Sequence, residues 1–167
     1  IIKMGISMSF IPEDRLGMGL VASMGMTDNM LLKSYKNGKS PFINKKPARE
    51  LALRLIDTLE IVTPGVTTPV SRLSGGNVQK VVIAREFSFD APVLIISQPT
   101  RGVDIGATQF IHRHIMDKRE QGCAILLCSA DLDEVFRLSD RIITLYEGEI
   151  TGQFRTNAIS KEELGYY

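Results

Sequence analysis

The sequence predicts an α/β fold in which helices cover a mostly parallel sheet, with a helical segment inserted near the N-terminal end. From residue 73 onward, short apolar runs alternate with helical stretches of about 8 to 15 residues, which is typical of parallel sheets with right-handed crossovers. Between residues 25 and 65 the pattern is helical throughout. A chain of 167 residues suits one domain with a substantial core.

The first residues predict a strand that enters a loop. Residues 4–12 alternate apolar and small polar side chains and stop at Pro12, as a half-buried strand does. Because the chain starts inside this strand and without methionine, we expect it to be a piece of a longer protein. Residues 13–26 contain three glycines and few regular signals, which predicts an ordered loop.

Two helices are predicted after this loop. Thr27 is the expected N-cap of a helix over residues 27–35. A break rich in Gly, Ser and Pro at 37–41 separates it from a longer helix over 45–61. Four apolar residues of the second helix share one face, namely Leu51, Leu55, Ile56 and Leu59.

Strands and helices alternate in the C-terminal part. We expect a glycine turn that opens a helix, then a strand, a helix, a strand, a short helix and a hairpin. In that order they cover residues 73–89, 92–96, 106–122, 123–129, 131–139 and 141–154. Gly122 closes the middle helix, and a Glu147-Gly148 turn joins the two arms of the hairpin.

The composition argues against a nucleic acid partner. The chain carries 20 basic and 19 acidic residues, for a net charge of +1, whereas nucleic-acid-binding domains usually present a strongly basic face. No run approaches the roughly 20 apolar residues that span a bilayer. A membrane role would therefore come through a partner protein.

The cysteines and histidines predict no metal site. Cys123 and Cys128 lie in an apolar run that predicts a buried strand, at an odd spacing that places them on opposite faces. We expect them to be reduced core residues of a cytosolic protein. His112 and His114 lie two positions apart on a helix and therefore face different directions.

The segment over residues 73–80 carries the strongest chemical signal. Ser74 is followed by Gly75 and Gly76 immediately before a helix. The glycines leave backbone N–H groups free to point outward at the positive end of the helix dipole. Such a turn holds an anion, most naturally phosphate, but on its own it is common, so its neighbours decide the interpretation.

In order and spacing, these motifs resemble the C-terminal two thirds of an ABC-transporter ATPase domain. The matching residues are Leu73, Ser74, Gly75, Gly76 and Gln79 for the signature, 93–98 for the Walker B strand, Thr100 to Asp104 for the D-loop, 129–131 for the switch-histidine segment and Glu13 for the Q-loop position. The "PEDR" sequence at 12–15 is most similar to the second ATPase domain of tandem sugar-type and nucleoside-type importer subunits. The resemblance covers nearly the whole chain.

The resemblance implies a P-loop NTPase core with an inserted helical subdomain. On this basis residues 1–24 form a core strand and a Q-loop-like segment, residues 25–72 the helical subdomain, and residues 73–167 the signature helix, the Walker B strand and the C-terminal core. It also implies ATP and Mg²⁺ as cofactors of the intact protein.

The chain departs from the family pattern in three respects. No GxxxxGK[ST] sequence occurs in it, so the Walker A loop is expected upstream of residue 1. The Walker B strand of active members ends in Asp-Glu, which hold Mg²⁺ and polarise the attacking water, and here Ser97 and Gln98 take these places. Ala130 replaces the switch histidine. We expect this domain's own site to hydrolyse ATP slowly or not at all. For the fragment alone we expect no activity and no bound cofactor or metal.

ABC ATPases work in pairs, which gives the degenerate domain a role. The resemblance implies that Ser74, Gly75 and Gly76, with Gln79, complete the ATP site of a second ATPase domain. Arg101 could reach across that dimer or pair locally. Further implied partners are transmembrane permease subunits at the cytoplasmic face of the membrane and, indirectly, an extracytoplasmic solute-binding protein.

Two clusters have ordinary structural interpretations beside functional ones. The methionines Met18, Met24, Met26 and Met30 are expected to give adaptable packing, with docking of the permease's coupling helix as the less favoured alternative. Asp131, Asp133 and Glu134 open a short helix, where negative charge suits the helix dipole, and we interpret them as capping residues.

By resemblance, the Walker A strand would lie between the strands predicted over 123–129 and 141–148. Without it, backbone groups of these strands would lack partners, which is costly. We therefore expect the two strands either to pair directly or to recruit another chain by strand exchange into an oligomer.

The leading functional expectation is ATP-driven import of a sugar or nucleoside, with this chain supplying the signature side of a composite site. One alternative is an ABC ATPase that acts without a membrane partner, which the "PEDR" segment and the near-neutral charge disfavour. Another is a non-enzymatic interaction or oligomerisation module, in which the Ser-Gly-Gly turn would have no role.

Overall fold

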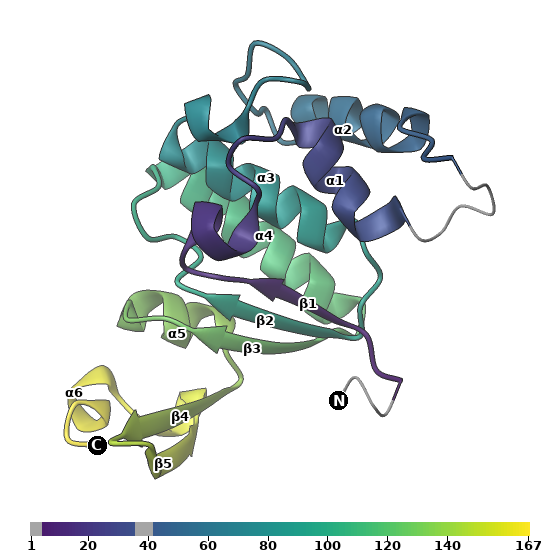
Figure 1. Cartoon of the computed structure of the whole chain (residues 1–167). Helices are drawn as coiled ribbons and strands as arrows, with labels where there is room; N and C mark the ends of the chain where they lie inside the picture. Colours follow the sequence, from purple (N-terminus) through teal and green to yellow (C-terminus); the bar gives the residue numbers. More distant parts are fainter. Residues whose placement is uncertain (1–4, 36–41) are drawn as a thin grey trace.

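The computed structural model describes residues 5–35 and 42–167 and has the α/β architecture that the sequence predicts (Figure 1). In order, its elements are β1 (Met8–Ile11), the π-helical turn η2 (Arg15–Gly19), α1 (Met26–Ser34), α2 (Lys46–Thr58), the 3-10 turn η4 (Val70–Arg72), α3 (Gly75–Phe87), β2 (Val93–Ser97), α4 (Ile105–Glu120), β3 (Ala124–Cys128), α5 (Leu132–Leu138), β4 (Arg141–Tyr146), β5 (Glu149–Arg155), η5 (Thr156–Ala158) and α6 (Lys161–Leu164). The break predicted at 37–41 and the start of the first predicted strand lie outside the described residues.

Strands β1, β2 and β3 form the predicted parallel sheet, and they lie in that order. Ile11 of β1 lies opposite Ile96 of β2, and Ser97 at the end of β2 lies opposite Cys128 of β3. Since the carboxyl ends of parallel strands share one edge, the segments that follow the three strands start close together. This edge positions the candidate site.

Strands β4 and β5 form a separate antiparallel hairpin. Its Glu147-Gly148 turn has positive φ angles of 48° and 85°, and the predicted hairpin is confirmed. Of the two outcomes expected for the strands predicted over 123–129 and 141–148, direct pairing is wrong, because β3 and β4 share no ladder among the described residues, and strand exchange stays a prediction. Figure 1 shows the hairpin set apart from the three-stranded sheet.

Strand β3 is consequently an edge strand rather than a buried one. Its Leu126 is 53% exposed, and Cys128 is exposed as well. The expectation of two core cysteines is therefore wrong for Cys128, and Cys123 is only half-buried. Both are free thiols, and desolvation raises the pKa of Cys123. The apolar sequence of this segment does not reveal which strands flank it.

The loop predicted over residues 13–26 is ordered by a buried side chain. The carboxamide of Asn29 accepts a hydrogen bond from the Val21 N–H at 2.8 Å. It also donates to the carbonyl groups of Val21, Met24 and Gly25 at 3.1 to 3.2 Å. One asparagine therefore satisfies backbone groups of the loop that would otherwise need water or another segment.

Helix α1 begins one position earlier than predicted. Its N-cap is Gly25, so the prediction that Thr27 caps this helix is wrong. A Cβ atom at residue 25 would lie 2.6 Å from the Val66 carbonyl oxygen, so only glycine fits there. Thr27 instead donates its N–H to the same carbonyl at 3.1 Å. This contact between distant segments fixes the start of α1.

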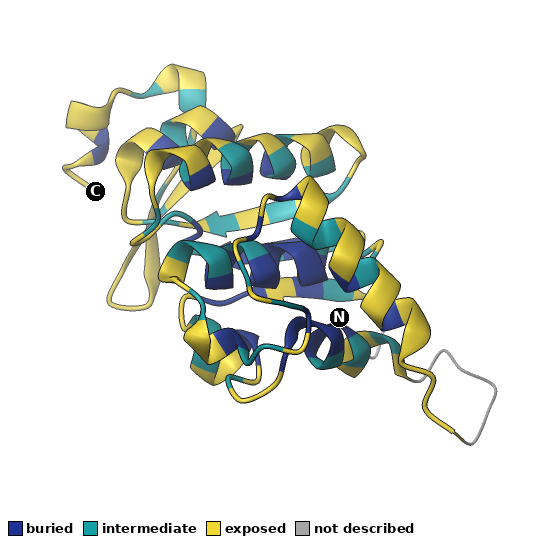
Figure 2. Ribbon diagram, turned by 90° about the horizontal axis from the view of Figure 1, so that it is seen from above, coloured by how far each residue is buried: buried dark blue, intermediate teal, exposed yellow. Residues whose placement is uncertain are grey.

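The helices form the core together with the sheet, and α3 is its centre. Eight of the 13 residues of α3 are buried, and Figure 2 shows buried positions gathered among the helices while the hairpin end is exposed. The predicted apolar face of α2 is confirmed, with Ala48, Ala52 and Leu59 buried and Leu51, Leu55 and Ile56 packed against the core. None of the described helices is both long and apolar enough to cross a membrane.

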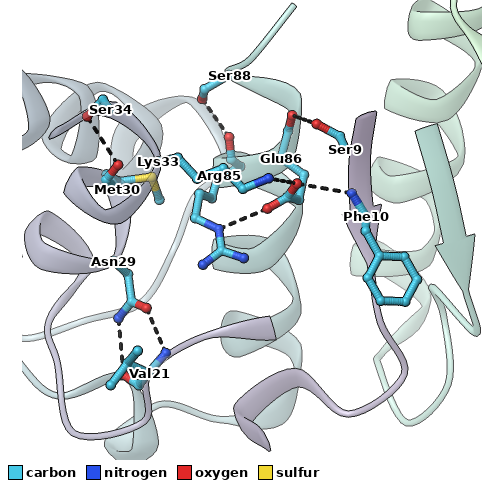
Figure 3. A network of polar contacts seen from close by, with 11 residues as sticks. Ser9, Phe10, Val21, Asn29, Met30, Lys33, Ser34, Arg85, Glu86 and Ser88 are labelled. Carbon is cyan, nitrogen blue, oxygen red and sulfur yellow. Dashed lines mark hydrogen bonds and ion pairs between the residues drawn. The ribbon is translucent and has the colours of Figure 1, made fainter. Parts of the chain in front are cut away.

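A buried carboxylate connects α3 to β1 and α1 (Figure 3). The side chain of Glu86 is fully buried and pairs with Arg85 at 3.0 Å and with Lys33. The Phe10 N–H donates to the same carboxylate at 3.2 Å, and the Ser9 hydroxyl donates to the Glu86 carbonyl at 3.0 Å. The buried charge is thus compensated from three elements, as a group of this kind requires.

Replacing Glu86 by alanine is expected to lower the free energy of unfolding by about 3 to 5 kcal/mol, because Arg85 would then remain buried without a counter-charge. Urea unfolding measures this change. Asp28→Ala is the control, since the Asp28–Lys45 pair is partly exposed on both sides and contributes about 0 to 1 kcal/mol. Similar losses in the two variants would contradict this role of Glu86.

Candidate functional site

The candidate site is built on the first turn of α3, here called the α3 turn (Ser74 to Asn77). Ser74 is the N-cap, and its hydroxyl accepts hydrogen bonds from the Asn77 N–H and, at 2.9 Å, from the Asn77 carboxamide. The N–H groups of Gly75 and Gly76 have no acceptor among the described residues. Ser74 and Gly75 are exposed. The α3 turn therefore presents unpaired N–H groups at the positive end of a 13-residue helix.

Charged side chains from two other segments flank the glycines. A Cβ atom at Gly75 would lie 3.3 Å from a guanidinium nitrogen of Arg15. A Cβ atom at Gly76 would lie 3.4 Å from a carboxylate oxygen of Asp104. A side chain at residue 75 would ask the Arg15 guanidinium for a small shift, whereas the contact at residue 76 is an ordinary van der Waals distance.

Asp104 caps α4 beside the α3 turn. Its carboxylate accepts the Ala107 N–H at 2.9 Å, and chiefly because of this hydrogen bond the pKa of Asp104 lies below its usual value of 3.8. The group is therefore ionised at neutral pH. Its negative charge is placed next to Gly76, whereas the guanidinium of Arg15 is next to Gly75.

Residues 13–15 join the α3 turn to the turn over 99–102. Arg15 donates to the Gly75 carbonyl at 3.2 Å and to the Arg101 carbonyl, and Glu13 pairs with the Arg101 guanidinium. The structure thus brings together Glu13, Gly75, Gly76 and Asp104, which lie far apart in the sequence. Arg101 pairs locally within the chain, which was one of its two expected roles.

Gln79 does not lie with them. It is 0% exposed, and both polar atoms of its side chain lack a hydrogen-bond partner among the described residues. Asn77 instead extends from the α3 turn and accepts the Val62 N–H at 2.9 Å. Sequence reasoning singled out neither Asn77 nor Arg15. No local signal marks Asn77, because a capping box needs Glu or Gln three residues after Ser74, and the contacts of Arg15 likewise depend on the fold.

Ser97 and Gln98, which the family resemblance predicts to stand in place of a catalytic acidic pair, lie at the carboxyl edge of the sheet. Gln98 follows β2 with a φ of 49° and donates its N–H to the Cys128 carbonyl at 2.8 Å. Its side-chain oxygen accepts the Ala130 N–H at 3.3 Å. Gln98 and Ala130 are therefore in direct contact, and Ser97 lies beside them in register with Cys128.

This edge does not fit a Mg²⁺ site. A hydroxyl and a carboxamide carry no charge, whereas Mg²⁺ is usually bound through one or two carboxylates. Among the described residues, no group of three or more His, Cys, Asp or Glu side chains is arranged to hold a metal ion. We assign no step of hydrolysis to Ser97 or Gln98.

The histidines and acidic residues near α4 and α5 have structural partners. His112 contacts the Glu134 carboxylate at 2.9 Å, and His114 contacts the Phe110 carbonyl at 3.0 Å, so the two rings face different groups. Asp131 caps α5 as predicted. Asp133 and Glu134 lie in the first turn of α5 as predicted, and the carboxylate of Glu134 is in addition buried against His112.

The methionines divide into two pairs. Met26 and Met30 are buried in the core, at 2% and 0% exposure, which confirms packing as their role. Met18 and Met24 are exposed, at 71% and 37%. Docking of a partner therefore remains a question only for the second pair.

The curated proteins to which the chain is similar include ATP-binding proteins for the import of sugars and nucleosides. The chain is 39% identical to the ribose import ATP-binding protein RbsA 2 of Rubrobacter xylanophilus, over 93% of this chain and 30% of that protein. It is 38% identical to the nucleoside import ATP-binding protein NupA of Lactococcus lactis subsp. cremoris, over 95% of this chain and 32% of that protein. The chain thus spans about a third of the length of these relatives. No family model matches it.

Comparison with solved structures gives the fold. The dimeric ATP-binding cassette MJ0796, in a post-hydrolysis state bound to ADP and Pi, superposes with a TM-score of 0.76. The match covers 92% of this chain and 65% of that chain at 21% sequence identity. Together with the import ATP-binding relatives, this fold shows that the chain belongs to the ATP-binding cassette (ABC) family.

Proposed function

We propose that this chain is the signature-bearing part of the ATP-binding subunit of an importer for a sugar or a nucleoside. The names of its relatives support the transport class. The observation that carries the proposal is the α3 turn, whose Gly75 and Gly76 N–H groups are unpaired at an exposed helix start. These groups suit a phosphate that a second ATPase domain holds.

On this proposal the chain completes its partner's site rather than its own. The second domain would bind ATP with Mg²⁺, and its triphosphate would contact Ser74, Gly75 and Gly76. Gln79 is buried and would only support the helix. Ser97, Gln98 and Ala130 would make the chain's own site weak. Residues 1–24, 25–72 and 73–167 would correspond to a core segment, a helical subdomain and a signature-bearing core.

The proposal also assigns a location and partners. The subunit would bind permease subunits at the cytoplasmic face of the membrane and meet a solute-binding protein only through them. The exposed Met18 and Met24 lie on the loop that precedes α1, a surface that suits such docking. A module without catalytic function is the second candidate, supported by the absence of carboxylates at positions 97 and 98.

In the complete ATPase that contains this chain, Ser74→Arg is expected to lower ATP turnover on the order of 10²-fold, because the guanidinium would block the N–H groups that stabilise the phosphate. Ser97→Asp combined with Gln98→Glu is expected to change turnover little. Phosphate-release assays measure both. Ser71→Arg adds the same charge just before the α3 turn and serves as control.

Retained turnover and transport in Ser74→Arg would reject the composite-site proposal and favour the non-enzymatic module. A large gain from the two restored carboxylates would show instead that this domain's own site limits turnover. The two results therefore separate the roles of the α3 turn and of the carboxyl edge.

We further propose that the isolated chain forms oligomers by strand exchange at β3. The edge of β3 that faces away from β2 has no partner among the described strands, and Leu126 on it is 53% exposed. The hairpin carries a second exposed apolar surface, with Ile143, Leu145, Tyr146 and Ile150 as its members. Unpaired edges of this kind recruit other strands.

The purified chain is therefore expected to sediment as a dimer or larger species rather than at its monomer mass of 18.5 kDa. Leu126→Lys should shift the distribution toward monomer, since lysine on an edge strand opposes pairing. Leu32→Lys is the control, because Leu32 is also exposed but lies on α1. A purely monomeric chain at all concentrations would contradict strand exchange.

A further inference from the structure

Arg15 is the side chain that joins the segments of the candidate site. Its guanidinium donates to the carbonyl of Gly75 in the α3 turn and to the carbonyl of Arg101 in the neighbouring turn. Arg15 itself starts the π-helical turn η2, whose N-cap Asp14 accepts the Gly17 N–H at 2.8 Å. One planar cation therefore holds backbone groups of two distant segments from a third, locally fixed segment.

The neighbouring ion pair cannot supply this connection alone. The side chains of Arg101 and Glu13 are 69% and 48% exposed, and ion pairs with this exposure contribute little because water and salt screen them. Arg15 is only half-exposed, and desolvation lowers the pKa of its guanidinium. Its two hydrogen bonds end on main-chain carbonyls rather than on a flexible side chain, and hydrogen bonds from a charged donor are stronger than neutral ones.

The contacts of Arg15 are to main-chain carbonyls rather than to side chains. A bond to the Gly75 carbonyl fixes the orientation of the peptide between Gly75 and Gly76, and hence the direction of the Gly76 N–H. This is one of the two N–H groups without an acceptor among the described residues. The bond to the Arg101 carbonyl sets the distance between the α3 turn and the segment that leads to Asp104.

We propose that Arg15 is a positioning residue that orients the α3 turn for the phosphate of a partner-held nucleotide. This inference rests on the proposed function of the α3 turn. Arg15 does not touch the nucleotide and acts through the Gly75 carbonyl. The fork of the guanidinium suits two carbonyls at once, whereas the single ammonium of lysine makes a weaker substitute.

The test combines two measurements on Arg15→Ala, Arg15→Lys and the control Arg113→Ala, in which an exposed arginine of α4 is removed. Amide hydrogen exchange of the purified chain should become about tenfold faster in peptides that cover 72–80 and 99–104, and remain unchanged at 82–90. In the complete ATPase, kcat of Arg15→Ala should fall on the order of 10- to 100-fold with little change in KM. Arg15→Lys should recover only part of the loss.

The test distinguishes a failure of the role proposed for Arg15 from a failure of the proposed function. If Ser74→Arg abolishes turnover while Arg15→Ala behaves like Arg113→Ala in either measurement, the composite site stands and the role of Arg15 is overturned. Exchange that rises along the whole chain, or full recovery by lysine, also overturns it. If Ser74→Arg leaves turnover intact, the proposed function fails first, and the positioning role fails with it.

Discussion

The buried carboxylate of Glu86 is the constraint on which the placement of α3 depends. It compensates Arg85 and Lys33 and accepts the Phe10 N–H, so it links α3 to β1 and to α1. A charge at this depth is stable only while these partners stay in place. The polar contacts therefore fix the position of β1 along α3. Apolar packing alone would define this position less strictly.

The same short segment contacts α3 at both ends. Ser9 and Phe10 bind at Glu86, and Arg15 binds at Gly75. From residue 75 to residue 86 a helix rises about 16 Å, and an extended chain covers about 20 Å between residues 9 and 15. The two lengths match closely enough for the segment to run alongside the helix. The α3 turn is thereby positioned relative to the sheet, although no strand leads directly into it.

Local patterns explain what the sequence predicts well. Alternating strands and helices, the hairpin turn and the Ser74 cap follow from periodicity and from turn or cap chemistry within a few residues. The wrong predictions concern positions where contacts between distant segments determine the structure. Gly25 rather than Thr27 starts α1 because Val66 lies against it, and β3 is exposed because no described strand flanks it on one side. The contacts of Arg15 likewise have no local signal.

The carboxyl edge of the sheet shows why the β2 strand can persist without its acidic pair. The Gln98 carboxamide accepts the Ala130 N–H, and the Gln98 N–H binds the Cys128 carbonyl, so the ends of β2 and β3 are joined by neutral groups. Two carboxylates at positions 97 and 98 would repel each other unless a cation lay between them. With serine and glutamine, the groups that join the strand ends carry no charge and need no cation between them. The edge can therefore support the following turn and, through Arg101 and Arg15, the α3 turn.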